Sequence, residues 1–237
     1  MTPIPLPADE VHVWTAPRDD APDAEVEACR DLLTVEERRR ADRFVAPLDR
    51  RRFAIGRGRL RTILGRYLDR APAGLRFASN PHGKPGLEGT ALRFNLTHSG
   101  TTMLVAITLG RELGVDIETI RPDFGGEAIA RRFFAPGEVA ALIGLPPAAR
   151  TLAFFQGWTR KEAYIKAQGK GLAMPLDEFE VEIRPDHPAR LIATRPDPAE
   201  AARWTLVELD APPGAVAALC VRGGGWTLCR RRWPDEG

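Results

Sequence analysis

The stretch Trp158-Thr159-Arg160-Lys161-Glu162-Ala163-Tyr164-Ile165-Lys166 carries the most information about this chain. It predicts one helix, because neither Gly nor Pro interrupts it before Gly169. Glu162 and Lys166 stand four positions apart and therefore share one helix face. One acid with two lysines beside it suits a site that holds a polyanion through a metal ion. Three apolar residues are expected to pack on the opposite side of the helix: Trp158, Ala163 and Ile165.

A Glu-to-Lys pair at this spacing is also common on exposed helices. There it contributes only about 0.2–0.5 kcal/mol to helix stability. The helix alone therefore leaves a plain surface ion pair as an alternative. Two further stretches favour a site, namely Phe94-Asn95-Leu96-Thr97-His98-Ser99-Gly100 and Gly114-Val115-Asp116-Ile117-Glu118.

The second of these stretches reads as a strand that carries two acids. The period of two places Asp116 and Glu118 on the same face of the strand. Two neighbouring carboxylates repel each other and also pay a desolvation cost, which a divalent cation would relieve. Oxygen ligands favour magnesium, manganese or calcium over zinc. A strand edge that faces solvent is the alternative for this segment by itself.

Length and composition indicate a globular protein. The 237 residues allow one large domain or two of about 100–120 residues. A hydrophobic content of 43% provides enough apolar material for a core. The formal net charge of only +2 argues against non-specific nucleic-acid binding as the main function. Arginines are nevertheless dense in residues 36–76, which suggests an anionic ligand or an acidic partner.

The cysteines and the N-terminus predict a cytoplasmic protein. Cys29, Cys220 and Cys229 form no metal motif, and an odd number of cysteines forms no complete disulfide framework. Residues 1–7 lack the basic and apolar regions of a signal peptide. No apolar run approaches the roughly 18 residues that span a membrane.

The periodicity predicts two blocks, each with several strands and one long helix. Helices are expected over 24–33, 34–45, 50–68, 128–134, 135–143 and 151–168. Strands are expected over 11–15, 75–78, 91–96, 101–109, 113–118, 179–183, 189–193, 204–209, 215–220 and 226–229. Thr34 and Glu37 predict a capping box, and residues 230–237 a poorly ordered tail. This pattern favours an α+β fold over a doubly wound sheet, and no dinucleotide or Walker motif is present.

Taken together, the three stretches resemble the three motifs of the 4'-phosphopantetheinyl transferases. Their order and the chain length match the surfactin-synthetase-activating type, a single chain of two similar halves, whereas the short acyl-carrier-protein synthases assemble as trimers. The segments His82-Gly83-Lys84-Pro85 and Gln168-Gly169-Lys170-Gly171-Leu172 also match flanking features of the family. The resemblance covers roughly residues 10–220. Each motif is weak alone, but the ordered set is specific.

The resemblance implies a fold and an activity. Two similar α+β halves, residues 1–110 and 111–229, would enclose an active site in the cleft between them. The protein would be a monomer that transfers 4'-phosphopantetheine from coenzyme A to a serine hydroxyl of an apo acyl, peptidyl or aryl carrier protein. The reaction would need Mg²⁺, with Mn²⁺ as a substitute, and would release 3',5'-adenosine bisphosphate.

The resemblance also assigns residues. Asp116, Glu118 and Glu162 would bind the metal. His98 and a basic residue such as Arg52 would contact the 3'-phosphate of coenzyme A. The remaining assignments place Lys84 and Thr97 at the nucleotide, Lys161 and Lys166 at the phosphates, and Glu162 and Lys166 in catalysis.

Several points stay open at this stage. The base that deprotonates the serine could be Glu162, Lys166 or a metal-bound water, and any arginine of 50–52 could contact the phosphate. Thr97 stands where many relatives have Ser, a change that keeps the hydroxyl. A carrier-binding or nucleotide-binding module without turnover is an alternative, which the intact acids disfavour. An arginine-rich nucleic-acid binder is disfavoured by the low net charge and by few aromatic residues among the arginines.

Overall fold

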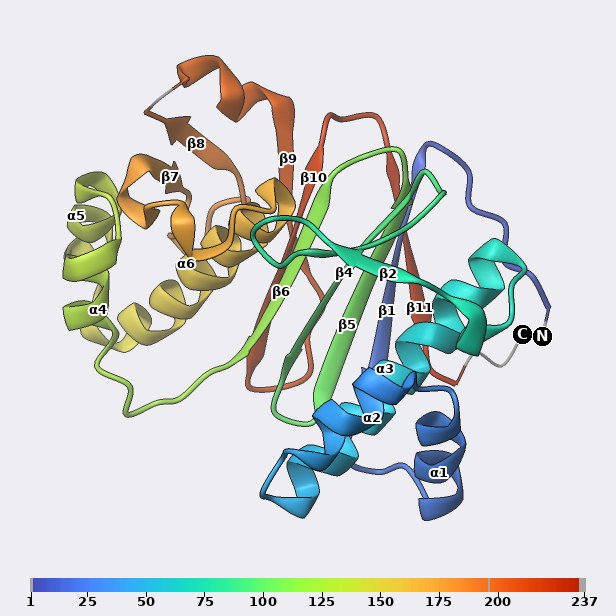
Figure 1. Cartoon of the computed structure of the whole chain (residues 1–237). Helices are drawn as coiled ribbons and strands as arrows, with labels where there is room; N and C mark the ends of the chain where they lie inside the picture. The colour runs from blue at the N-terminus through green and yellow to red at the C-terminus, as the bar shows by residue number, and fades with distance from the viewer. Residues whose placement is uncertain (1, 196, 235–237) are drawn as a thin grey trace.

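The computed structural model describes residues 2–195 and 197–234. Its helices and strands follow one another in two blocks, as Figure 1 shows. The first block contains β1 (Glu10–Pro17), α1 (Asp23–Asp31), α2 (Val35–Asp42), α3 (Pro47–Leu68), β2 (Phe77–Ser79), β3 (Pro85–Leu87), β4 (Leu92–Ser99) and β5 (Thr102–Leu109). The second contains β6 (Leu113–Thr119), α4 (Gly126–Phe133), α5 (Pro136–Gly144), α6 (Pro147–Gln168), β7 (Phe179–Val181), β8 (Leu191–Thr194), β9 (Trp204–Leu209), β10 (Ala215–Arg222) and β11 (Thr227–Arg232).

The N-terminal half packs α3 against a sheet with the strand order β11-β1-β5-β4. The apolar stripe of α3 buries Leu60, Ile63 and Leu64 against Trp14 and Phe94 of the sheet. This stripe has helical spacing, so burial of one face explains why the segment is a helix. The capping box is confirmed, since the backbone N–H of Glu37 donates to the Thr34 hydroxyl while the Glu37 carboxylate accepts from the Thr34 N–H.

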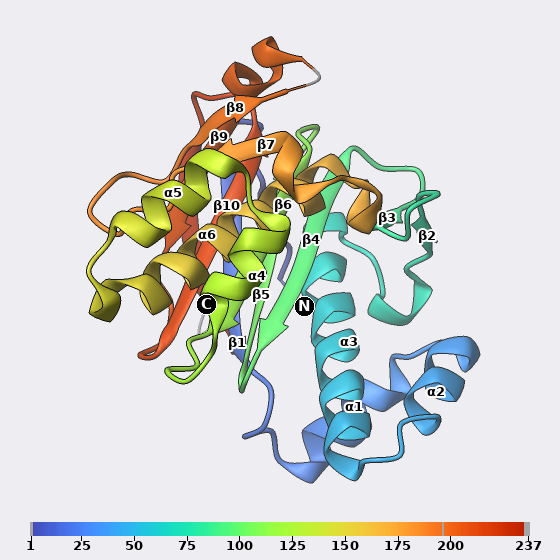
Figure 2. The ribbon, with the colours of Figure 1, turned by 90° about the vertical axis from the view of Figure 1, so that its left-hand side faces the viewer.

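The C-terminal half packs α6 against the sheet β6-β10-β9. Gly114 of β6 allows this helix to come unusually close. A Cβ atom at Gly114 would collide with the backbone of α6 at Ala163 and Ala167. The helix ends at Gly169, whose φ of +67° is the left-handed conformation that favours glycine. Figure 2 shows α4, α5 and α6 grouped together and separate from α1, α2 and α3.

The two halves meet where β4 lies beside β6 (Figure 1). Side chains of β4 join these strands, because Asn95 Oδ1 accepts from the Val115 N–H at 2.9 Å and Ser99 Oγ accepts from the Thr119 N–H at 2.9 Å. Each half thus combines a sheet with one helix of 22 residues. The predicted α+β fold of two similar halves is confirmed.

The C-terminal strand differs from expectation. β11 runs through Arg232 and pairs in parallel with β1, with His12 opposite Cys229. Residues 230–232 therefore continue a strand where the sequence suggested a disordered tail, because the exposed edge of β1 supplies backbone hydrogen-bond partners. The strand also places a segment from the end of the chain in the sheet of the N-terminal half. Residues 235–237 of the expected tail lie outside the described residues.

The hydropathy of the helices bears on whether any of them could cross a membrane. Within the described residues, no helix combines the length with the apolar composition that crossing a membrane requires.

Candidate active site

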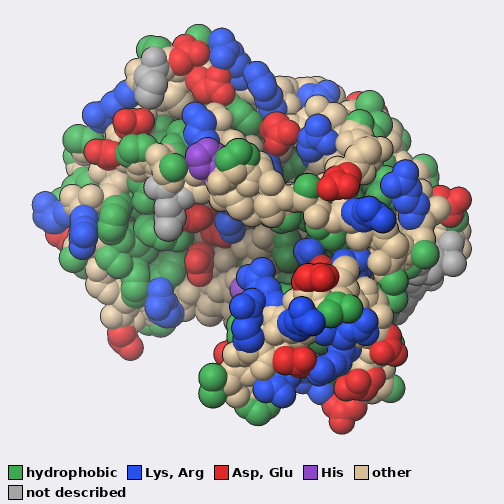
Figure 3. Space-filling model, viewed as in Figure 1, with side chains coloured by type: hydrophobic (Ala, Val, Ile, Leu, Met, Phe, Trp, Pro, Cys, Tyr) green, Lys and Arg blue, Asp and Glu red, His purple; other side chains and the backbone are tan. Residues whose placement is uncertain are grey.

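A cavity of about 390 Å³ opens where β4, β6 and α6 meet. Every residue that lines it comes from one of the three stretches singled out in the sequence: Leu96, Thr97, His98, Asp116, Glu118, Trp158, Glu162 and Lys166. Figure 3 shows acidic side chains in the hollow between the C-terminal half and the Lys and Arg side chains gathered over α2 and α3. The site therefore lies at the junction of the two halves, where β4 of one half faces β6 and α6 of the other.

Asp116 and Lys166 form the centre of this cavity. Lys166 Nζ lies 2.5 Å from Asp116 Oδ1, and the Asp116 side chain is only 5% exposed. Thr97 supports the pair, since its hydroxyl donates to Asp116 Oδ1 at 3.0 Å and lies 3.1 Å from Lys166 Nζ. The second oxygen of the acid, Asp116 Oδ2, is buried and has no hydrogen-bond partner among the described residues.

The three acids at the site destabilise one another. Burial raises the pKa of Asp116. Burial and then the charge of Asp116 raise the pKa values of both Glu118 and Glu162. Carboxylates that desolvation and mutual repulsion disfavour gain most from a cation placed between them. Their oxygen donors and the unpartnered Asp116 Oδ2 fit a hard divalent ion.

A different group of side chains meets a purely geometric test for a metal site. Ligand atoms of Glu10, His12 and Cys229 lie within 4.8 Å of one another, which the three acids do not achieve in the described structure. Both nitrogens of His12 are already engaged, however, with Glu10 at 2.8 Å and with the Tyr67 hydroxyl at 2.7 Å. The guanidinium group of Arg231 also lies 3.2 Å from the imidazole. This group is best explained as a hydrogen-bonded network that fastens β11 to β1.

The three arginines at positions 50–52 have different partners in the structure. Arg51 is directed to Asp23 at 2.5 Å, and Arg50 donates to the Phe44 carbonyl. Arg52 instead makes a two-point contact with Asp19, through Nε at 2.7 Å and Nη2 at 2.5 Å. Its charge also contributes to the lowered pKa of His98, after burial, Arg18, and Lys166. Of the three, Arg52 is the one whose charge reaches His98, although none of them lines the cavity.

The structure does not bring Lys161 to the cavity. This side chain is fully buried on another side of α6, where Nζ lies 2.7 Å from Glu138 Oε2 and donates to the carbonyls of Leu176 and Phe179. Burial raises the pKa of Glu138 and lowers that of Lys161, so desolvation disfavours both charges. The pair instead joins α5, α6 and β7, since the Val181 N–H also donates to Glu138.

We expect Lys161→Met to act on stability. Removing one partner leaves Glu138 buried without its cation, which typically costs about 3–5 kcal/mol. Chemical denaturation should show this loss, while turnover per folded molecule should stay close to that of the original protein. The double variant Lys161→Met, Glu138→Gln should recover part of the stability, because it removes the uncompensated charge. Normal stability with lost turnover would return Lys161 to the site.

Lys84 is also held outside the cavity. Its ammonium group donates to Glu112 Oε2 at 2.9 Å and to the carbonyls of Leu113 and Ala167, each at 3.1 Å. The same loop reaches α6 through Asn80 Nδ2, which donates to the Gly169 carbonyl. The loop thus fastens the N-terminal half to the end of α6, and all three hydrogens of the ammonium group have acceptors.

Two apolar residues, Trp158 and Leu96, line the cavity although the sequence did not predict them there. Trp158 was expected on the opposite side of the helix, but it stands four residues before Glu162 and eight before Lys166, so it shares their face. It also stacks on Phe134 and Phe154. Leu96 lines the other wall. The spacing of four would have identified Trp158, whereas nothing in the sequence distinguishes Leu96.

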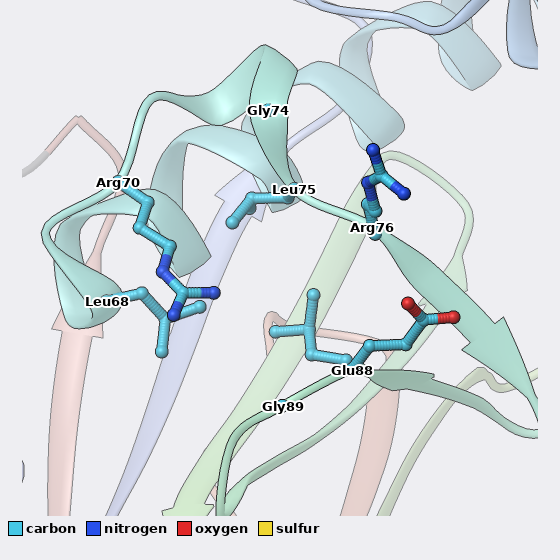
Figure 4. A pocket seen from close by; sticks show the side chains of 8 residues that line it. Leu68, Arg70, Gly74, Leu75, Arg76, Glu88 and Gly89 are labelled. Carbon is cyan, nitrogen blue, oxygen red and sulfur yellow. The ribbon is translucent and has the colours of Figure 1, made fainter.

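A further hollow lies at the end of α3, beside β2 and β3 (Figure 4). Figure 4 shows two arginines, Arg70 and Arg76, around it together with Glu88, and the side chain of Leu75 directed toward it. Its lining contains a single acid, so it offers no set of carboxylates for a metal ion. None of the residues of the three stretches lines it.

The fold brings three acids and a lysine into one cavity at the junction of two like halves, a set of side chains that suits a metal ion and a phosphate-bearing group. Comparison with known proteins identifies the family. A family model described as "4'-phosphopantetheinyl transferase superfamily" matches residues 112–220, and one described as "4'-phosphopantetheinyl transferase, N-terminal" matches residues 20–109. The chain belongs to the 4'-phosphopantetheinyl transferase superfamily. It is a transferase that attaches phosphopantetheine to carrier proteins.

Relatives match along most of the chain. The 4'-phosphopantetheinyl transferase HetI of Nostoc sp. (strain PCC 7120) is 40% identical over 227 residues, which cover 94% of this chain and 92% of that protein. The 4'-phosphopantetheinyl transferase Sfp of Bacillus subtilis (strain 168) is 30% identical over 197 residues, covering 83% and 85%. The holo-[acyl-carrier-protein] synthase of Thermotoga maritima aligns in structure with a TM-score of 0.38 at 18% identity, covering 47% of this chain and 62% of that one.

Proposed function

We propose that this transferase takes its phosphopantetheine from coenzyme A and requires Mg²⁺. The acceptor is the serine hydroxyl of an apo carrier protein, and 3',5'-adenosine bisphosphate leaves. One observation supports this most strongly, namely that Asp116, Glu118 and Glu162 face one cavity together with Lys166. Transfer of a phosphoryl-linked group depends mainly on positioning and on neutralising charge, and these are the groups that such a reaction needs.

Asp116, Glu118 and Glu162 would hold the ion. Their donors are all carboxylate oxygens, and Asp116 Oδ2 is available because it has no partner among the described residues. When bound, Mg²⁺ would neutralise charge on the pyrophosphate of coenzyme A. In the structure Lys166, whose side chain is 27% exposed, compensates part of the charge of Asp116.

The two catalytic candidates receive different roles. Lys166 Nζ lies beside the Asp116 carboxylate in the cavity, where an ammonium group can contact the phosphates of the substrate, so it serves as a phosphate clamp. Glu162 has a raised pKa, and the described residues offer its carboxylate no hydrogen bond or ion pair. A carboxylate oxygen that faces the cavity and has no partner among the described residues can accept a proton from a serine hydroxyl placed there. We therefore assign Glu162 to take the proton of the serine hydroxyl.

The nucleotide end of coenzyme A is assigned to the N-terminal half. His98 and Arg52 would contact the 3'-phosphate, since His98 lines the cavity and the charge of Arg52, on α3, reaches His98. Thr97 would line the site through its position between Asp116 and Lys166. Lys84 and Lys161 take no part in this assignment, because their ammonium groups are engaged elsewhere.

Mass spectrometry of the intact carrier protein tests the function. The protein is incubated with coenzyme A, Mg²⁺ and, in separate reactions, apo carriers from fatty-acid, polyketide and non-ribosomal peptide synthesis. At least one carrier should gain a single phosphopantetheine, and chelation of the metal should prevent the gain. Binding of coenzyme A without a change of mass in any carrier would instead favour a binding module without turnover.

Stability should report the metal site independently of activity. Folding raises the pKa values of Asp116, Glu118 and Glu162. At a pH between the unfolded and the folded pKa values, the folded protein therefore binds more protons than the unfolded chain. The free energy of unfolding then falls as pH rises through this range. Mg²⁺ needs deprotonated ligands and offsets this loss. Saturating Mg²⁺ should therefore raise the melting temperature more at about pH 7.5 than at about pH 5. An equal shift at both pH values, or the same shift in Glu162→Gln, would contradict the site.

A further inference from the structure

Arg18 follows β1 at the end that lies nearest to the cavity. Its backbone N–H donates to the Thr101 carbonyl at 2.8 Å, so the pairing with β5 extends by one residue. Side chains alternate along a strand, and Trp14 and Ala16 pack in the core beneath α3. Arg18 has the same parity and continues that face.

His98 reaches the same face from β4. Phe94 and Leu96 precede it at intervals of two and also pack in the core beneath α3. Arg52 belongs to α3 itself and is held there by Asp19, the neighbour of Arg18. Three cationic or potentially cationic side chains, Arg18, Arg52 and His98, therefore converge under one helix from three separate elements.

Arg18 is unusual for a buried arginine because it lacks a partner. Only 9% of the residue is exposed, yet in residues 2–195 and 197–234 its guanidinium group has no hydrogen bond or ion pair. Asp19 and Asp49 are the acids whose charges act on the Arg18 guanidinium group. Both carboxylate oxygens of Asp19, however, already accept hydrogen bonds from Arg52. Burial and the charge of Arg52 accordingly lower the pKa of Arg18. No guanidinium nitrogen of Arg18 is fully shielded from solvent without a partner, so the group stays open to an anion.

We infer that Arg18 is a third contact for the 3'-phosphate of coenzyme A, beside Arg52 and His98, and that it determines specificity for coenzyme A over dephospho-coenzyme A. This inference rests on the function proposed above. A guanidinium group presents two parallel N–H donors that match a phosphate monoester. Asp19 is then a positioning residue, because its two-point contact fixes the guanidinium plane of Arg52.

Kinetics with two donor substrates test the role of Arg18. The full-length protein and its variant Arg18→Met are assayed with coenzyme A and with dephospho-coenzyme A on the same apo carrier. Loss of a charged hydrogen bond should lower kcat/KM for coenzyme A by roughly 10- to 100-fold, mainly through KM. The value for dephospho-coenzyme A should change little, so the preference for coenzyme A should shrink. Arg18→Lys should restore part of the preference. Arg51→Gln, whose ion pair with Asp23 lies apart, is the matched control.

Calorimetry gives a second measurement that does not require turnover. Arg18→Met should weaken binding of 3',5'-adenosine bisphosphate and leave that of adenosine 5'-monophosphate almost unchanged. Its melting temperature should hold, because the Arg18 side chain makes no hydrogen bond or ion pair within the described residues that the substitution would break. An unchanged preference between the two donors, equal losses with both, or a markedly lower melting temperature would overturn the role of Arg18. Failure of the original protein to transfer from coenzyme A would instead overturn the proposed function.

Discussion

Asp116→Ala is expected to lower the rate of transfer by about 100-fold or more, since that is the usual cost of removing charge stabilisation at a reacting phosphoryl group. Asp116 is the most buried of the three acids at the site, and its Oδ2 has no partner in the part of the chain that the structure describes. Its loss would remove a metal ligand and also the carboxylate that holds Lys166 in place. Turnover should be measured with saturating Mg²⁺ and coenzyme A, so that weaker binding is not mistaken for slower chemistry.

The fold should survive this substitution. Burial disfavours the charged form of Asp116, so removing the carboxylate relieves a desolvation cost, and Lys166 remains partly exposed to water at 27%. The melting temperature without metal should therefore hold, while its rise with Mg²⁺ should disappear. The isosteric variant Asp116→Asn is the matched control for packing and should behave in the same way. Near-normal turnover in either variant would remove Asp116 from the metal site.

Lys166→Ala should also lose about 100-fold or more in rate, and its melting temperature should change little in saturating Mg²⁺, which would neutralise the buried Asp116 in place of Lys166. If Lys166 were only one member of a surface ion pair on α6, its removal would cost a few tenths of a kcal/mol and leave the rate unchanged. The structure gives it a different environment, with Nζ between Asp116 and Thr97 inside the cavity. Lys161→Met is the natural comparison, because it is expected to change stability and leave the rate per folded molecule nearly constant.

Lys166→Arg separates two roles for the same side chain. Arginine keeps the positive charge and cannot give up its proton at working pH. Substantial activity in this variant would support a phosphate clamp and leave Glu162 as the proton acceptor. Glu162→Gln should then lose both turnover and the Mg²⁺-dependent rise in melting temperature. Full activity in Lys166→Ala would contradict the assignment of this face of α6 to the site.

The local pattern of the sequence determined most of the site. The period of two in β6 placed Asp116 and Glu118 on one face, and the spacing of four in α6 placed Glu162 beside Lys166. The elements themselves also followed from local signals, as the confirmed capping box at Thr34 shows. These features depend only on backbone geometry, which repeats in every helix and strand.

The tertiary structure decided which face of each element meets the cavity. Lys161 adjoins Glu162 in sequence, yet it is buried against Glu138, because α6 is covered on several sides and a charged residue can find a partner on any of them. Trp158 packs against the core of the C-terminal half, as its apolar character suggested, and it also lines the cavity, which its apolar character did not indicate. The choice among Arg50, Arg51 and Arg52 depended on where Asp19 and Asp23 lie after folding. Arg18 and β11 meet their neighbours only through contacts between distant segments, which no local pattern records.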